Sequence, residues 1–285
     1  MIIDAHAHIF TSLIVENVAK KKEMAKKLCL ETEEALKRIG VETLENSMKV
    51  ANVEACLVLP TANAENVKKV NTTFFEIAAN SKMIRTAGTL HPDYSGNKEE
   101  LNRFKKLGIK AIKMCSFSQG FVLNGKKAID LFDMIKNENR TNNCEYFIIL
   151  DTFYNADIFF GTENKYNTTP KLFGEIIKSY PEIKFVGAHM AGLDAPFDKI
   201  SKHLLPRDNF FLDTSNADHT LSEDEFVYLL KTHGPEHIFF GTDWPWFGYK
   251  LEIDIVAKRL DKAGFTPEQK KDVFKNNIAK LLGII

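Results

Sequence analysis

The chain opens with two histidines that are spaced to act together. Residues 1–9 read MIIDAHAHI, and apolar and polar side chains alternate along them, as in a half-buried β-strand. Side chains two residues apart in a strand point the same way, so His6 and His8 would project from one face with their backbones about 6–7 Å apart. Imidazole is a common ligand of zinc and similar ions. The spacing therefore indicates a metal site, although two histidines can also simply end a polar strand face.

Three further side chains with useful chemistry stand at the ends of strand-like segments. Lys113 lies near the end of IKAIKM, His189 closes KFVGAH and Asp243 closes IFFGTD. Each alone has an ordinary explanation, as a solvated lysine, a core histidine or an aspartate that caps a turn. If the first and last strands are neighbours, however, Asp243 joins His6 and His8. Two nitrogens and one carboxylate form a ligand set that suits zinc or a similar divalent ion.

The elements that must position these residues alternate between strands and helices. Apolar runs typical of strands recur at residues 2–9, 54–60, 83–90, 109–115, 146–152, 184–189, 209–214 and 237–243. Amphipathic stretches typical of helices occupy residues 64–79, 99–106, 126–137, 171–179, 222–231 and 252–263. This order predicts a parallel sheet with crossover helices, and 285 residues suit a closed (β/α)8 TIM barrel. An open doubly wound sheet is the alternative, but its Gly-rich first turn is missing.

One segment interrupts this alternation. Residues 16–40 are highly charged, have the period of a helix, and stand between the first strand and the helix that should follow it. Such a helical insertion can be a solvated surface helix, supported by charge pairs such as Glu34 with Arg38. It can also be a lid, because loops that follow barrel strands lie on the catalytic face. Since no linker or repeat is visible, we expect residues 1–285 to form a single domain.

The composition excludes several classes of partner. Lys plus Arg and Asp plus Glu both number 38, so the zero net charge gives no reason to expect nucleic acid or an anionic membrane. No apolar run reaches the ~20 residues of a membrane span, and the N-terminus has no basic-then-apolar secretion signal. The cysteines are scattered without a CxxC pair, which indicates neither disulfides nor a thiolate metal site. We expect a cytoplasmic protein that binds a small-molecule substrate, with a homodimer left open.

Six motifs occur in order along the chain: HAH at 6–8, GIKAIK at 108–113, AHMAG at 188–192, LDTS at 212–215, GTDWP at 241–245 and NIAKLLG at 277–283. Together they resemble the amidohydrolase superfamily. The specific resemblance is to its amidohydrolase-related branch, which contains aminocarboxymuconate semialdehyde decarboxylase. The likeness spans essentially the whole chain.

The resemblance implies roles for particular residues. His6, His8 and Asp243 correspond to ligands of one divalent ion, usually zinc, with manganese also suitable. His189 corresponds to a histidine that contacts the metal-bound water or the substrate. Relatives carry a further histidine ligand in a Leu-Ile-His-Thr context, whereas residues 149–152 here read ILDT. Because a carboxylate can also bind zinc or manganese, we expect Asp151 to lie within reach of the ion.

Lys113 and aromatic residues at the barrel mouth are expected to bind substrate. Some superfamily branches use a carboxylated lysine to bridge two metals, but they also need a histidine where this chain has Asp151. Lys113 would instead bind a substrate carboxylate or carbonyl as a cation. Trp244 belongs to a group of aromatic residues that would line an apolar pocket or simply pack. The group comprises Phe117, Phe121, Phe153, Tyr154, Trp244, Trp246, Phe247 and Tyr249.

These expectations favour a metal-dependent hydrolase of an amide, lactone or similar bond. The ion would activate a water, Asp243 would move its proton, and His189 would stabilise the developing oxyanion. One alternative is non-oxidative decarboxylation of an unsaturated or aromatic acid, in which Asp243 or His189 delivers a proton to carbon. Another is a catalytically silent barrel that binds a small ligand. We favour hydrolysis because the negative charge of Asp151 would disfavour an anionic substrate.

Overall fold

The structure is a computed structural model that describes residues 1–284, and contacts between residues divide the chain into two compact units. Unit 1 comprises Met1–Leu59, Ile77–Arg85 and the chain from Asp213 onward. Unit 2 comprises Pro60–Glu76 and Thr86–Leu212. Each unit has its own buried apolar core. The expected single domain therefore stays a prediction.

All the strand-like runs of the sequence contain strands. The strands are β1 (Ile2–Ala7), β2 (Val53–Val58), β3 (Ile84–Thr86), β4 (Gly88–Thr89), β5 (Ala111–Met114), β6 (Phe147–Leu150), β7 (Lys184–Gly187), β8 (Phe210–Asp213) and β9 (Ile238–Phe239). The run at residues 83–90 is split into β3 and β4. Ladders in the described part of the chain make a three-stranded and a six-stranded parallel sheet rather than one closed ring.

Helices occupy every stretch where the sequence has a helical period. The α-helices are α1 (Ser12–Ala19), α2 (Lys22–Lys27), α3 (Thr32–Lys37), α4 (Val41–Val50), α5 (Val67–Ala79), α6 (Asn97–Leu107), α7 (Ser116–Gln119), α8 (Lys126–Asn142), α9 (Ala156–Phe160), α10 (Pro170–Ser179), α11 (Phe197–His203), α12 (Glu223–His233), α13 (Tyr249–Ala263), α14 (Pro267–Lys271) and α15 (Asn277–Leu282). Within residues 1–284, no helix is both long enough and apolar enough to cross a lipid bilayer.

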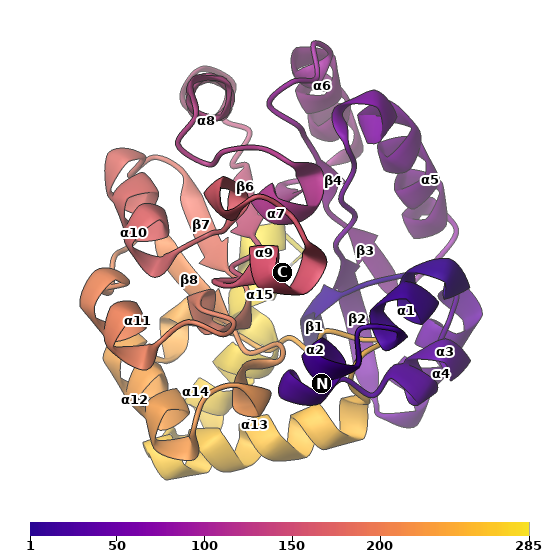
Figure 1. The fold of residues 1–285 in the computed structure, drawn as a ribbon, viewed down its shortest axis with the longest axis vertical. Helices are drawn as coiled ribbons and strands as arrows, with labels where there is room; N and C mark the ends of the chain where they lie inside the picture. The colour runs from indigo at the N-terminus through magenta and orange to yellow at the C-terminus, as the bar shows by residue number, and fades with distance from the viewer. Residues whose placement is uncertain (285) are drawn as a thin grey trace. The chain divides into compact units, whose positions relative to one another are not determined.

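Unit 1 is organised around β1, which has a strand partner on each side. On one side β2 runs parallel to it, and β3 follows β2, as Figure 1 shows. On the other side lies the segment after β9, where the Ala5 N–H donates to the Phe240 carbonyl at 2.8 Å and the His8 N–H donates to the Trp244 carbonyl at 2.7 Å. The first and last strands are therefore neighbours, as the sequence predicted.

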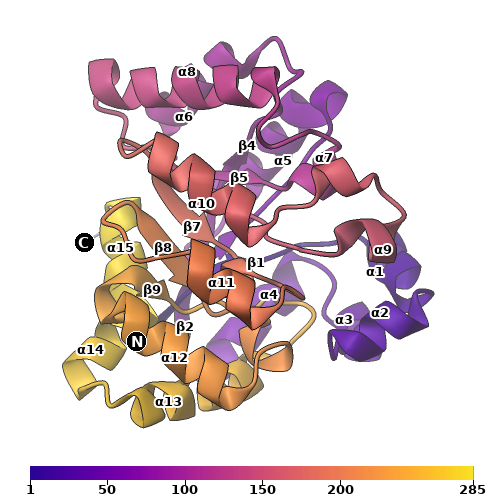
Figure 2. The same ribbon diagram turned by 60° about the vertical axis from the view of Figure 1, so that its left-hand side comes forward.

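The insertion after β1 consists of three short helices, α1 to α3, instead of one long helix (Figure 2). It begins at Ser12, ahead of the expected start at Glu16, because the apolar triplet at residues 13–15 hides the helical period. Val15 and Ala35 are fully buried against Trp246 and Phe247, which follow β9. The insertion thus packs on the loop that continues from the last strand, and its function as a lid stays a prediction.

Unit 2 contains the parallel strands β4 to β8. Their register places Thr89 opposite Lys113, and Lys113 opposite Ile149. Ile149 in turn lies opposite Val186. These strands are buried on both faces and so read as continuous apolar runs rather than alternating ones. In this unit, α6 packs against α8 (Figure 2).

Asn71 on α5 provides a test of how unit 2 is held together. Its side chain is buried, donates to the Thr89 carbonyl at 3.0 Å and to the Glu100 carboxylate at 2.7 Å, and accepts from the Thr89 N–H at 2.8 Å. Asn71→Ala removes these three hydrogen bonds from buried groups and should lower the free energy of unfolding by about 2–3 kcal/mol. Chemical denaturation measures this change.

The matched control is Thr72→Ala, the neighbouring residue on the exposed face of α5, whose hydroxyl donates only to the Lys68 carbonyl. A change within about 0.5 kcal/mol is expected there. Equal stability of the two variants would contradict a supporting role for the Asn71 bonds.

Candidate active site

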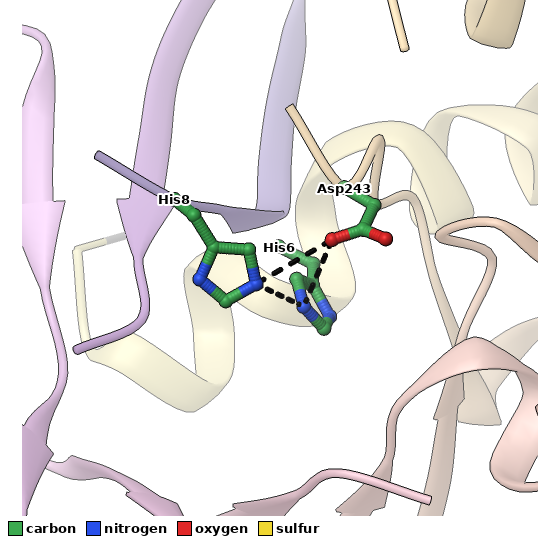
Figure 3. Close-up of side chains that lie close together, drawn as sticks. All are labelled: His6, His8 and Asp243. Carbon is green, nitrogen blue, oxygen red and sulfur yellow. Dashed lines mark hydrogen bonds and ion pairs between the residues drawn. The ribbon is translucent and has the colours of Figure 1, made fainter. Parts of the chain in front are cut away.

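Three side chains from opposite ends of the chain converge in unit 1. His6 is the fifth residue of β1, His8 follows the strand end, and Asp243 follows β9 (Figure 3). The Nε2 atoms of His6 and His8 lie 3.0 Å apart. Asp243 Oδ1 lies 3.8 Å from Nε2 of His6 and 3.4 Å from Nε2 of His8. The sequence predicted this convergence, because neighbouring first and last strands bring their carboxyl ends together.

The other nitrogen of each ring faces a hydrogen-bond acceptor. His6 Nδ1 lies 2.8 Å from Asp213 Oδ2, and His8 Nδ1 lies 3.1 Å from the Leu59 carbonyl oxygen. Carboxylate and carbonyl oxygens only accept, so both Nδ1 atoms carry the proton and donate it. In the neutral ring each Nε2 then presents a lone pair. Metal-binding histidines commonly have this arrangement, in which the outer nitrogen is fixed by an acceptor.

The chemistry of this donor set fits a divalent cation. Two imidazole lone pairs and one carboxylate oxygen point into the same small space and repel one another unless a cation or a shared proton lies between them. Their ligand atoms all lie within 4.8 Å of one another, and the three side chains are at least mostly buried. Nitrogen and oxygen donors of this kind suit zinc and manganese.

Asp4 fixes the backbone at His6 and at Thr242, the residue before Asp243. Its carboxylate accepts from the His6 N–H at 2.9 Å, from the Thr242 N–H at 3.1 Å and from the Thr242 hydroxyl at 2.6 Å. Burial raises the pKa of Asp4 to about 7, while the hydrogen bonds from Thr242 and His6 oppose that rise. Asp4 thus ties β1 to the residue before Asp243. Asp4 shares the alternating face of the two histidines, a signal that could have identified it.

Asp243 itself has a left-handed backbone conformation, with φ of 59°. This conformation is uncommon outside glycine, asparagine and aspartate. The Asp243 N–H donates to the His6 carbonyl at 2.9 Å, and its carbonyl accepts from the Trp246 N–H at 3.0 Å. These two bonds turn the chain sharply at the strand end and aim the carboxylate at the histidines.

Two aromatic rings lie beside His8. Phe10 stacks on the His8 imidazole, with centroids 4.8 Å apart and planes 11° apart, and Trp246 contacts the Phe10 ring at 5.5 Å. Trp246 was among the aromatic residues expected at the mouth, whereas sequence analysis missed Phe10. Trp244, expected to bind substrate, has no exposed surface in the structure. Its role in substrate binding stays a prediction.

The remaining predicted site residues, Lys113, Asp151 and His189, form a cluster in unit 2 at the ends of β5, β6 and β7. Lys113 is fully buried, and its Nζ lies 3.3 Å from Asp151 Oδ2. The other oxygen of Asp151 lies 3.6 Å from His189 Nε2. The carboxylate therefore stands between a lysine and an imidazole. Its charge is largely matched by Lys113, and its role as a metal ligand stays a prediction.

Aromatic side chains gather near this cluster within unit 2. Phe153 follows β6 and packs edge-on against Phe117 with centroids 5.8 Å apart. Phe159 and Phe160 of α9 stack on Phe153 and Phe117, respectively, both at 5.2 Å. The sequence predicted Phe117 and Phe153 here, and missed the two residues of α9 because a single short turn has no clear period.

Comparison with known proteins agrees with this geometry. Residues 3–284 match the family model described as amidohydrolase. The chain belongs to the amidohydrolase family. A search of curated proteins found no match.

Solved structures that resemble this amidohydrolase are TIM barrels. An uncharacterised TIM-barrel protein from Bordetella bronchiseptica has a TM-score of 0.74 and 16% identity over 99% of this chain and 98% of its own. The 5-carboxyvanillate decarboxylase of Sphingomonas paucimobilis has a TM-score of 0.70 and 15% identity over 99% and 98%. The dihydroxybenzoic acid decarboxylase of Polaromonas sp. JS666, solved with manganese and 2-nitroresorcinol, has a TM-score of 0.69 and 15% identity over 99% and 97%. The predicted TIM-barrel fold is confirmed.

The prediction that this amidohydrolase is a hydrolase is wrong on these comparisons. The similar enzymes are mainly decarboxylases, which supports the alternative reading. The error lay in the charge attributed to Asp151. With Lys113 Nζ at 3.3 Å, that carboxylate adds little net negative charge and gives no reason to disfavour an anionic substrate. Zinc is not confirmed either, because the ion in the dihydroxybenzoic acid decarboxylase is manganese.

Gly241 offers a test of the metal centre. A Cβ at this position would lie 2.9 Å from the Cβ of His6 and 3.3 Å from the Cβ of Ser215. Gly241→Ala must therefore push β1 and its histidine out of place, and metal affinity should fall roughly 10-fold, as when the support of a ligand is lost. Titration of the purified protein with zinc or manganese measures the dissociation constant.

Gly264→Ala is the control, since that glycine has φ of 83° and no heavy atom within 4 Å of the added Cβ. It should cost stability through backbone strain and leave metal affinity unchanged. If Gly241→Ala binds the ion as tightly as the wild type, the close approach at His6 has no part in metal binding.

Proposed function

We propose that this amidohydrolase catalyses the non-oxidative decarboxylation of an aromatic or unsaturated carboxylic acid, with one divalent ion held by His6, His8 and Asp243. The observation that carries this proposal is the convergence of two Nε2 lone pairs and a carboxylate oxygen within 3.8 Å. The activities of the similar enzymes give the reaction class. Manganese is the first ion to test and zinc the second.

When bound, the ion would supply positive charge that orients the substrate's oxygen atoms and stabilises negative charge developing on them. The chain's own residues do the rest. His6 and His8 hold their Nε2 atoms in place through the bonds at Nδ1. Phe10, which is partly exposed and packs on Trp246, presents aromatic surface beside His8, and this surface suits a planar ring.

The cluster in unit 2 supplies a cation and a proton donor. TIM-barrel enzymes draw active-site residues from the ends of several strands, so we assign Lys113, Asp151 and His189 to the same reaction. Lys113 Nζ is buried and makes an ion pair with Asp151 but no hydrogen bond of good geometry. Such a buried ammonium has the capacity to bind a substrate carboxylate.

His189 serves as the proton donor in this scheme. A protonated imidazole is stabilised by the Asp151 carboxylate at 3.6 Å. His189 donates its proton to the substrate carbon that bears the carboxylate. The bond between that carbon and the carboxylate then breaks, its electron pair restores the π system of the substrate, and carbon dioxide leaves. The proton consumed is recovered by His189 from solvent.

The reaction class is tested with the metal-loaded enzyme and a panel of hydroxybenzoic and unsaturated acids beside matched lactones and amides. We expect release of one carbon dioxide per turnover and, in deuterium oxide, one deuterium at the carbon that lost the carboxylate. His189→Asn should reduce turnover roughly 10²- to 10⁴-fold, the usual contribution of a general acid, while metal content stays unchanged.

His203→Asn on α11 is the matched control for a histidine outside both clusters, and it should retain full activity. Opening of a lactone or amide without release of carbon dioxide would show the proposal to be wrong. A metal-free wild type after purification with manganese and zinc present would equally overturn the assignment of the ion.

A further inference from the structure

The contact between Asp213 and His6 belongs to a longer polar segment, Asp-Thr-Ser-Asn at residues 213–216. These residues end β8 and continue beyond it within unit 1. All four are buried, with exposed fractions of 1% or less. Polar side chains buried to this extent need partners. The partners of this segment include two of the three proposed metal ligands.

Asp213 and Ser215 surround the outer nitrogen of His6. Asp213 Oδ2 accepts from His6 Nδ1 at 2.8 Å, and Ser215 Oγ lies 3.1 Å from the same nitrogen. The other oxygen, Asp213 Oδ1, accepts from the N–H of Ser215 at 3.2 Å and also from its hydroxyl. The carboxylate cannot rotate without losing these bonds. Its fixed position keeps the proton of His6 on Nδ1 and the lone pair on Nε2.

Asn216 holds the carboxylate of Asp243 in the way that Asp213 holds the ring of His6. Its Nδ2 donates to Asp243 Oδ2 at 3.3 Å, an orientation required because only the amide nitrogen can donate to a carboxylate. The oxygen that faces the two histidines is the other one, Oδ1. Asn216 has φ of 57°, a left-handed conformation that asparagine tolerates better than most residues. The Asn216 amide thus binds Oδ2 of Asp243 and leaves Oδ1 to face the two histidines.

Thr214 fastens this segment to the strand that leads to Asp243. Its hydroxyl donates to the Gly241 carbonyl at 3.2 Å and accepts from the Gly241 N–H at 3.1 Å. Its own N–H donates to the Phe239 carbonyl at 3.0 Å. Residues 213–216 therefore form one fixed segment that contacts both His6 and Asp243.

We propose that Asp213 and Asn216 are positioning residues of the metal centre: together they determine that His6 binds through Nε2 and Asp243 through Oδ1. This inference rests on the proposed metal site. His8 is outside this control, because its Nδ1 donates to the backbone carbonyl of Leu59. Residues 213–216 therefore orient His6 and Asp243, and the backbone carbonyl of Leu59 orients His8.

The tautomer of His6 can be observed without any metal. In ¹⁵N-labelled, metal-free protein, the Nδ1–H of His6 should give a downfield proton signal because it donates to a carboxylate. Asp213→Ala should abolish this signal. Asp213→Asn keeps an acceptor oxygen but removes the charge, so the signal should remain and move upfield. A merely structural role for Asp213 would not produce this graded response.

Metal affinity gives the second measurement. Asp213→Ala should weaken binding of manganese or zinc roughly 10- to 100-fold, as loss of an outer partner of a ligating histidine typically does, with Asp213→Asn in between. Asn216→Ala should also weaken binding, and should alter the visible spectrum of the cobalt-loaded protein because both oxygens of Asp243 become available.

Asn71→Ala is the control for general destabilisation, since it removes a buried polar side chain from unit 2 and should leave metal affinity unchanged. Wild-type affinity in Asp213→Ala and Asn216→Ala, or an equal loss in Asn71→Ala, overturns the inference while the metal site stands. A wild-type protein that binds no ion overturns the proposed function instead.

Discussion

The hydrogen bonds between β1 and the segment after β9 are the constraint on which the candidate site depends. They join the fourth to eighth residues of the chain to residues more than two hundred positions later. Without this pairing His6 and His8 would stand alone on a strand end. With it, Asp243 arrives opposite them, and Asp4 bonds to Thr242 hold the junction in register. The proposed metal site therefore depends on the pairing of β1 with the segment after β9 and not on any single motif.

Buried charges in both units are paired in ways that set their chemistry. Asp213 matches His6, and Asp151 lies between Lys113 and His189. A buried charge without a partner would be costly, so each pairing both stabilises the fold and sets the protonation of its neighbour. The same residue types without these partners would favour different chemistry, as the misjudged charge of Asp151 shows.

Periodicity in the sequence predicted much of the fold. Apolar runs located every strand, since buried parallel strands are continuously apolar, and the HAH spacing indicated two candidate ligands of a metal ion. Chain order then predicted Asp243 as the third. The breaks in the insertion were not visible, because its charged residues fit one long helix as well as three short ones.

The residues that contact and orient the candidate site residues were harder to predict from the sequence, for a physical reason. An aspartate at a strand end, such as Asp213, looks like an ordinary turn residue until the ring it contacts is known. The partner of Asp151 was equally hidden, because Lys113 lies on another strand and only the register brings the two together. Reaction class depends on such pairings across strands, and single-sequence patterns do not reveal them.

The bond between Asp4 and Thr242 joins groups 238 positions apart in the chain. During synthesis on the ribosome, the two histidines emerge more than two hundred residues ahead of Asp243. Bringing such distant segments together carries a large loop-closure entropy and is expected late in folding. The proposed ion would then gain its third ligand only after the chain has been synthesised past Asp243.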